Sequence, residues 1–210
     1  DATNRLLRGD FEQHNTDNSW NNAQVNYNVK IGDGTDAALA YDANGNIKRM
    51  QHWGLTVTGS EPIDDLIYGY YSNSNKLQSV TENASGGTPS AGSTTQSLGD
   101  FADKNTNGND YGYDENGNLI TDLNKRMNGA TGNNLGGGGA ITYNHLNLPS
   151  QIVVKKDDDS PKGAITFTYD AAGNKLKKEV AEIGKPTKTT LYLGGLVFEN
   201  DTLQYLTHEE

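Results

Sequence analysis

Short runs of alternating apolar and polar residues recur along the chain, and most of them end at a tyrosine followed by turn-forming residues. In the run "AITFTYD" at residues 164–170, Ile165, Phe167 and Tyr169 occupy alternate positions, and such residues share one face of a β-strand. No stretch combines a sustained helical period with helix caps, and residues 122–127 are expected to form at most a short helical turn. The pattern predicts an all-β protein.

Further strand-like runs are "AQVNYNVKI" at 23–31, "AITYNHL" at 140–146, "SQIVVKK" at 150–156, "TTLYLGGLVFE" at 189–199 and "LQYLTH" at 203–208. Three polar, low-complexity segments separate these runs, at 15–22, 84–99 and 128–139. Their Gly, Ser and Asn content indicates surface loops between hairpins and not linkers between domains.

One short pattern repeats along the chain, and it organises the strands. Near-complete copies are "YDANGNIKRM" from Tyr41, "YDENGNLITDL" from Tyr113 and "YDAAGNKLKKEV" from Tyr169. Degenerate copies are "YYSNSNKLQSV", in which we align Tyr71, and "YNHLNLPSQI" from Tyr143. Most copies start roughly 30 residues apart, and the loop at 84–99 lengthens the one long interval.

Each copy predicts a β-hairpin. The pairs Asn44-Gly45 and Asn116-Gly117 suit two-residue type I′ turns, in which both central residues have positive φ. The aspartate after the tyrosine is expected to accept hydrogen bonds from turn amides.

The type I′ turn also fixes a register between the strands. Under that register Tyr113 lies across from Ile120, and Tyr169 lies across from Leu176. The first copy, which begins at Tyr41, fits less well, and either a longer loop or a bulge would account for it.

The candidate structural site consists of four residues in each near-complete copy: the tyrosine, the aspartate, the glycine and the asparagine. These residues are Tyr41, Asp42, Gly45 and Asn46, then Tyr113, Asp114, Gly117 and Asn118, and finally Tyr169, Asp170, Gly173 and Asn174.

Tyr-Asp, two variable residues, Gly-Asn and then an apolar residue resembles the YD repeat of the Rhs (rearrangement hot spot) proteins. The resemblance covers roughly residues 39–210, with flanks similar to the last repeats before the Rhs-associated core. It implies a large bacterial polypeptide whose hairpins join side by side into a curved, spiralling antiparallel sheet. In bacterial Rhs proteins and Tc-toxin components such a sheet forms a hollow shell around a C-terminal toxic domain, and in teneurins a similar shell supports adhesion.

The resemblance also implies where this chain differs from a whole family member. We expect the chain to stop before the core motif with its aspartate-based self-cleavage site, and to carry no C-terminal toxin. We therefore expect a non-catalytic segment, with any enzymatic activity of the parent outside it. Residues 1–38 would be an irregular or strand segment continuing from upstream repeats, and residues 39–210 one YD-repeat β-sheet domain.

Composition and charge support the fold class and limit the kinds of partner and site that are expected. Only 33% of the residues are hydrophobic while 25 are glycine, which favours short strands joined by many turns over a helical core. The formal net charge of −10 makes nucleic acid an unfavourable partner. The chain has no cysteine and no apolar run of membrane-spanning length, so neither a thiolate site nor membrane insertion is expected.

One stretch follows the spacing of a calcium-binding EF-hand loop. In "DKNTNGNDYGYD", Asp103, Asn105 and Asn107 take positions 1, 3 and 5, Gly108 takes position 6, and Asp114 takes position 12. The stretch lacks the usual glutamate at position 12 and any flanking helix. An Asx-rich loop is therefore favoured, with calcium as the weaker alternative and no other cofactor expected.

A second interpretation is a binding module for glycans or a cell-surface receptor, because Trp20, Trp53 and outward-facing tyrosines could stack on sugar rings. The histidines at 14, 52, 145 and 208 form no metal-ligand pair in sequence. The first interpretation remains a segment of a secreted or cell-surface shell. Its partners would be flanking repeats and a C-terminal payload, and its open sheet edges are expected to self-associate weakly.

Overall fold

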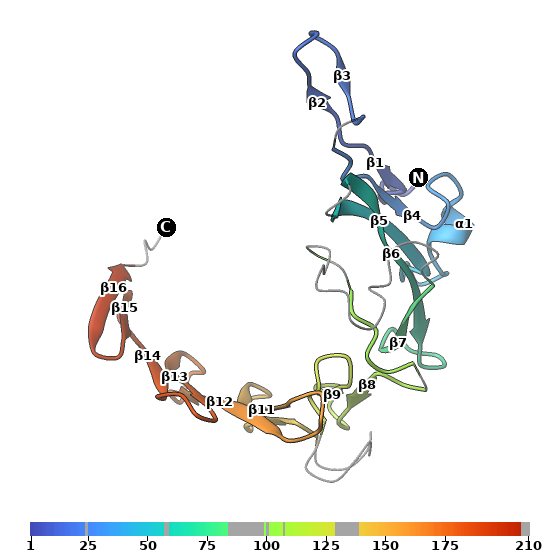
Figure 1. Cartoon of the computed structure of the whole chain (residues 1–210). Coiled ribbons are helices and arrows are strands. Elements are labelled where there is room, and N and C mark those ends of the chain that lie inside the picture. The colour runs from blue at the N-terminus through green and yellow to red at the C-terminus, as the bar shows by residue number, and fades with distance from the viewer. Residues whose placement is uncertain are drawn as a thin grey trace. The chain divides into compact units, whose positions relative to one another are not determined.

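The computed structural model describes residues 1–23, 25–56, 59–83, 99, 101–106, 108–128 and 139–206 (Figure 1). The chain divides into two compact units, unit 1 at Asp1–Gly108 and unit 2 at Asn109–Glu210. The predicted boundary between residues 38 and 39 falls inside unit 1, where strands from both of its sides belong to one sheet.

Unit 1 contains a five-stranded antiparallel sheet in the order β1-β4-β5-β6-β7. Its strands are β1 (Arg8–Gly9), β4 (Val29–Ile31), β5 (Arg49–Thr56), β6 (Gly59–Tyr70) and β7 (Leu77–Glu82). A separate small hairpin pairs β2 (Gln13–His14) with β3 (Trp20–Asn21), so the polar segment at 15–22 forms the hairpin turn and the whole of strand β3.

The one helix among the described residues is the single turn α1 (Ala37–Ala40). The side chain of Asp36 caps it by accepting a hydrogen bond from the backbone nitrogen of Ala38 at 2.8 Å. An aspartate followed by "AALA" is a capping signal that the strand-like pattern around it hides.

Unit 2 is a series of consecutive antiparallel strands. The hairpin of β8 (Tyr111–Tyr113) and β9 (Leu119–Asp122) precedes a seven-stranded sheet that runs from β10 to β16 in chain order. The seven strands are β10 (Ile141–Tyr143), β11 (Pro149–Lys155), β12 (Pro161–Tyr169), β13 (Lys175–Glu182), β14 (Lys188–Leu193), β15 (Leu196–Glu199) and β16 (Thr202–Leu206). The prediction of an all-β protein with antiparallel sheets is confirmed.

Two local predictions differ from the structure. The run at 189–199 is not one strand, because Gly194 and Gly195 adopt positive φ angles of 52° and 82° and turn β14 into β15. Residues 122–127 are not helical either. They form a reversal in which Asp122 and Met127 pair across the chain, with Arg126 at a φ of 56°.

The apolar core is thin in both units. Unit 1 buries Ile31, Ala40, Ile63, Leu66 and Val80, and unit 2 buries Leu123, Ala140, Ile141 and Val197. With so few buried apolar side chains, backbone pairing and the contacts between successive hairpins must supply much of the stability. Among the described residues, no helix has the length and apolar character to cross a membrane.

Candidate functional site

The motif turns differ from the predicted type I′ geometry. Gly45, Gly117 and Gly173 have positive φ angles of 87°, 86° and 89°, but Asn44 and Asn116 have negative φ. A type I′ turn needs positive φ at both central residues, so the predicted turn type is wrong.

The hydrogen bonds identify the turn that forms instead. The nitrogen of Gly45 donates to the carbonyl oxygen of Asp42 at 3.1 Å, and the nitrogen of Asp42 donates to the carbonyl oxygen of Asn46 at 2.9 Å. This is a three-residue loop, a type I turn followed by a glycine in the left-handed region that makes a bulge. The same pair of bonds closes the turns at Asp114 and Asp170.

The extra loop residue shifts the strand register by one. Tyr113 pairs with Leu119 and not with Ile120, and Tyr169 pairs with Lys175 and not with Leu176. The first copy has the same register, because Tyr41 pairs with Ile47. All three copies therefore have one geometry, and the bulge considered for the first copy occurs in each.

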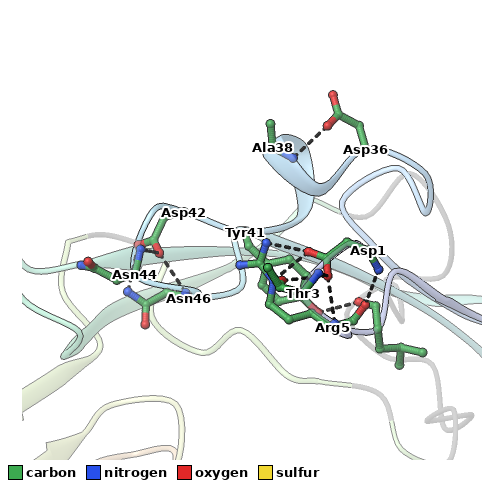
Figure 2. A network of polar contacts seen from close by, with 10 residues as sticks. Asp1, Thr3, Arg5, Asp36, Ala38, Tyr41, Asp42, Asn44 and Asn46 are labelled. Atoms are coloured by element: carbon green, nitrogen blue, oxygen red, sulfur yellow. Dashed lines mark hydrogen bonds and ion pairs between the residues drawn. The ribbon is translucent and has the colours of Figure 1, made fainter.

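The aspartate of the motif closes the loop with its side chain. In the third copy, Oδ1 of Asp170 accepts hydrogen bonds from the backbone nitrogens of Ala172 and Asn174, both at 2.9 Å. Its Oδ2 accepts from Nδ2 of Asn174 at 2.8 Å. Asp42 and Asp114 hold Asn46 and Asn118 in the same way, with Nδ2–Oδ2 distances of 2.8 and 2.9 Å. The three-residue loop therefore explains why Asp, Gly and Asn recur at this spacing in the motif. Figure 2 shows the loop of the first copy, with Asp42 and Asn46.

These bonds lower the pKa of each motif aspartate. The side-chain amide of the motif asparagine is the largest cause for Asp42, Asp114 and Asp170, and the turn amides add to it. Donors aimed at a carboxylate favour its ionised form.

Acid should therefore weaken the turns. Because the pKa of each motif aspartate falls on folding, its contribution to stability is fully present above the ordinary value of about 3.9. That contribution is lost as the pH falls through the lowered value. We expect the melting temperature to drop below about pH 4, and to drop less in Asp170→Asn, which has one fewer titrating group. A melting temperature that stays level down to pH 2 in thermal unfolding monitored by circular dichroism would contradict this.

The motif tyrosine reaches the preceding hairpin. In four copies its hydroxyl donates to the carbonyl oxygen of the first residue after the preceding turn, so each of these four tyrosines links two hairpins. The bonds run from Tyr41 to Leu6, from Tyr70 to Ile47 at 2.8 Å, from Tyr143 to Leu119 at 2.7 Å and from Tyr169 to Pro149 at 3.0 Å. Burial raises the pKa of Tyr70, Tyr143 and Tyr169.

This contact corrects the alignment of the second copy. Tyr70, the residue before the aligned Tyr71, bonds to the preceding hairpin and pairs with the opposite strand at Leu77. The turn that follows Tyr70 is one residue longer than the motif turn, because the nitrogen of Tyr71 bonds to the carbonyl of Lys76.

Removing one linking hydroxyl should cost a measurable part of the stability. We expect Tyr143→Phe to lower the free energy of unfolding by about 1 kcal/mol, the usual net value of one such hydrogen bond. Tyr192→Phe is the matched control, because the Tyr192 hydroxyl makes no hydrogen bond within the described part of the chain, and its change should stay below about 0.5 kcal/mol. Urea titrations of both variants make the comparison, and equal losses would show that the hydroxyl contact is not a link.

Asparagine side chains form a second link, along the edge where the turns lie. Nδ2 of Asn46 donates to Oδ1 of Asn75 at 3.0 Å, and Nδ2 of Asn118 donates to Oδ1 of Asn147, also at 3.0 Å. In both cases the acceptor lies in the turn of the next hairpin. The motif asparagine therefore bonds to its own aspartate and to its neighbour at once.

The start of the chain carries one more turn of this kind, which the sequence analysis missed. Oδ1 of Asp1 accepts from the nitrogens of Thr3 and Arg5, both at 2.9 Å, and Asn4 takes the left-handed position with a φ of 60°. The Arg5 side chain replaces the motif asparagine by bonding to Asp1 and covers the ring of Tyr41 at 4.3 Å (Figure 2). The signal was present in the sequence as "DATNRL".

The last motif turn, at Asp170, has no asparagine bond to the next turn among the described residues. The next hairpin turns through Gly194 and Gly195, and Asn174 bonds only to Asp170 among the described residues. A hollow of about 400 Å³ remains there. The residues that line it include Asp170, Asn174, Lys175 and Tyr192, and the Lys175 ammonium lies 5.8 Å from the centre of the Tyr192 ring.

A group of buried polar residues around β8 and β9 was also not predicted. It consists of Asp110, Thr121, Asp122, Asn124 and Asn128. Together with burial, the charges of Asp122 and Asp110 raise the pKa of Tyr111 to about 12. Alternation alone gives no signal for these residues, because their polar side chains were expected to face solvent.

The proposed calcium ligands are divided between the two units of the chain. Asp103 and Asn105 lie in unit 1, where Oδ2 of Asp103 accepts from the nitrogen of Glu82 at 3.3 Å, and Asn107 lies outside the described residues. Asp114 lies in unit 2, bound to Asn118. Calcium binding stays a prediction, for which calorimetric titration is the test. Within the described ranges no three His, Asp or Glu side chains form a group suited to a metal ion.

Two of the histidines have defined neighbours. Nδ1 of His52 lies 3.3 Å from Oδ2 of the buried Asp64, and His14 packs edge-on against Trp20 at 5.3 Å between ring centres. Trp20 itself is 65% exposed. His145 is exposed in a turn, and His208 lies outside the described residues.

No known protein-family model matches this chain, and no curated protein sequence matches it either.

Proposed function

We propose that this chain is a non-catalytic structural segment of an exported YD-repeat shell of the Rhs type, one that encloses or presents a C-terminal toxin or effector domain. The proposal rests on the hydrogen bonds that the repeated residues form within and between hairpins. The Asp, Gly and Asn of the motif close their own loop. Tyrosine hydroxyls bond to the preceding hairpin, and Asn46 and Asn118 bond to the next one. Side chains committed to such bonds are poorly placed to act as acids, bases or nucleophiles.

The proposal places the segment outside a bacterial cell, with flanking repeats of the same polypeptide as its first partners. An acidic chain with a net charge of −10 is unsuited to nucleic acid. The terminal strand β16 is exposed along its whole length, with Leu206 71% exposed. An edge strand of this kind favours pairing with a further strand.

The isolated chain should therefore self-associate weakly. Light scattering over a concentration series should show an apparent mass that rises with concentration, since an uncovered edge strand has free backbone groups to pair. A constant monomer mass up to the highest soluble concentration would contradict open edges.

The shell function is tested in the full-length polypeptide that contains this segment. Limited proteolysis should leave the C-terminal effector intact while the sheet is folded. Gly163→Ala, which disturbs the pairing of β12 with β13, should expose the effector to cleavage, whereas Gly9→Ala should not. Equal cleavage of the effector in the parent and in Gly163→Ala would overturn the shell proposal.

A second candidate, a glycan- or receptor-binding module, is favoured by one feature. The hollow beside the last motif turn combines a carboxylate, an amide, an ammonium group and a tyrosine ring, which are the groups that hydrogen-bond and stack on a sugar. A glycan array probed with the parent and with Tyr192→Ala would test it. A saturable signal that Tyr192→Ala abolishes supports binding there, and no saturable signal removes this candidate.

A further inference from the structure

Two of the motif turns contain the dipeptide that most readily undergoes spontaneous deamidation. In an Asn-Gly pair the glycine nitrogen attacks Cγ of the asparagine, a new C–N bond closes a succinimide, and the side-chain nitrogen leaves as ammonia. Water then opens the ring to aspartate or isoaspartate, so the only co-reactant is water. Glycine permits the attack because it has no side chain to hinder the approach.

The sequence holds four Asn-Gly pairs. Two of them, Asn44-Gly45 and Asn116-Gly117, lie wholly within described turns. In the pairs at 107–108 and 128–129, one member falls outside the described residues.

The nucleophile is equivalent in the two described turns. The φ angles of Gly45 and Gly117 are 87° and 86°. Their nitrogens donate to the carbonyl oxygens of Asp42 and Asp114 at 3.1 and 3.0 Å. Any difference in rate between the two turns must therefore come from the asparagine side chain.

The two side chains have different surroundings. Nδ2 of Asn116 donates to Oδ1 of Asn147 at 3.1 Å, which anchors the amide to the neighbouring turn. The side chain of Asn44 is exposed and makes no hydrogen bond to any described residue, although its backbone nitrogen bonds to Asp42 (Figure 2). Asn44 is therefore free to rotate its Cγ toward the nitrogen of Gly45.

We propose that Asn44 is a deamidation site of this chain, and that the neighbouring turn protects the otherwise equivalent Asn116. The product places a new negative charge beside the Asp42 carboxylate. Isoaspartate also inserts one backbone carbon into a loop that closes with three residues. The first motif turn would lose its geometry, and with it the bond from Asn46 to Asn75.

The experiment is ageing of the folded, full chain in mildly alkaline buffer, followed by peptide mapping with mass spectrometry. Asn44 should convert several-fold faster than Asn116. In Asn147→Gly the rate at Asn116 should rise toward that of Asn44, while the rate at Asn44 stays unchanged. Glycine suits position 147 because Asn147 has a φ of 58°, the conformation that the motif glycines adopt.

Three results would overturn the proposal. The first is an Asn116 rate equal to or above the Asn44 rate in the parent. The second is an Asn116 rate that does not respond to Asn147→Gly. The third is a rate difference that persists in denaturant, which would assign the effect to local sequence and not to the fold.

Discussion

Gly45→Val should lower the free energy of unfolding by about 2–3 kcal/mol, because a β-branched residue would be held at a φ of 87°. Space is not the cause, since the nearest heavy atom to an added Cβ is a terminal nitrogen of Arg5 at 3.8 Å. The cost is therefore that of the backbone conformation. Chemical denaturation of the variant against the parent measures it.

Asn44→Ala is the control that separates the two turn types. In a type I′ turn Asn44 would also need positive φ, and alanine there would cost about 1–2 kcal/mol. In the three-residue loop Asn44 has negative φ, so the change should stay below about 0.5 kcal/mol. Comparable losses at positions 44 and 45 would restore the type I′ turn and refute the bulged loop.

Gly163→Ala should be the most disruptive single change in the sheet of unit 2. An added Cβ would lie 2.3 Å from the carbonyl oxygen of Ala181 and 3.0 Å from Cα of Glu182, both of them backbone atoms of the paired strand β13. Backbone atoms cannot move away without opening the ladder, so we expect a loss of about 3 kcal/mol.

Gly9→Ala is the matched change at a strand glycine with space around it, because no atom lies within 4 Å of the added carbon. It should alter stability by less than about 0.5 kcal/mol. Urea or thermal unfolding of both variants makes the comparison. If Gly163→Ala were as stable as Gly9→Ala, the register in which Gly163 faces Glu182 would be wrong.

The sequence predicts the fold class because period-two alternation and turn residues are local properties. It could not decide the turn type at Asn44-Gly45, since both candidate turns need glycine in the left-handed region and accept asparagine before it. The third copy held the deciding signal. It has Ala172 before Gly173, and alanine is unfavourable at the positive φ that a type I′ turn would require there.

The links between hairpins were harder to predict. The tyrosine was expected to pair within its own hairpin, whereas its hydroxyl reaches a backbone carbonyl of the preceding one, as Tyr143 does with Leu119. Every residue has a backbone carbonyl, so the acceptor of a tyrosine hydroxyl cannot be recognised from its residue type. The alignment of Tyr71 in place of Tyr70 failed for the same reason: two adjacent tyrosines cannot be ranked without knowing which hydroxyl finds a carbonyl.

Tyrosines of the repeated motif join successive hairpins through their hydroxyl groups. Solution NMR on the isotope-labelled chain tests these links most directly, through ring-to-backbone contacts and hydroxyl proton exchange of the tyrosines. We expect contacts from Tyr143 to Leu119 and from Tyr169 to Pro149, with hydroxyl protons that exchange more slowly than that of Tyr192. Tyrosine contacts confined to their own hairpins, with hydroxyl exchange as fast as at Tyr192, would contradict these links.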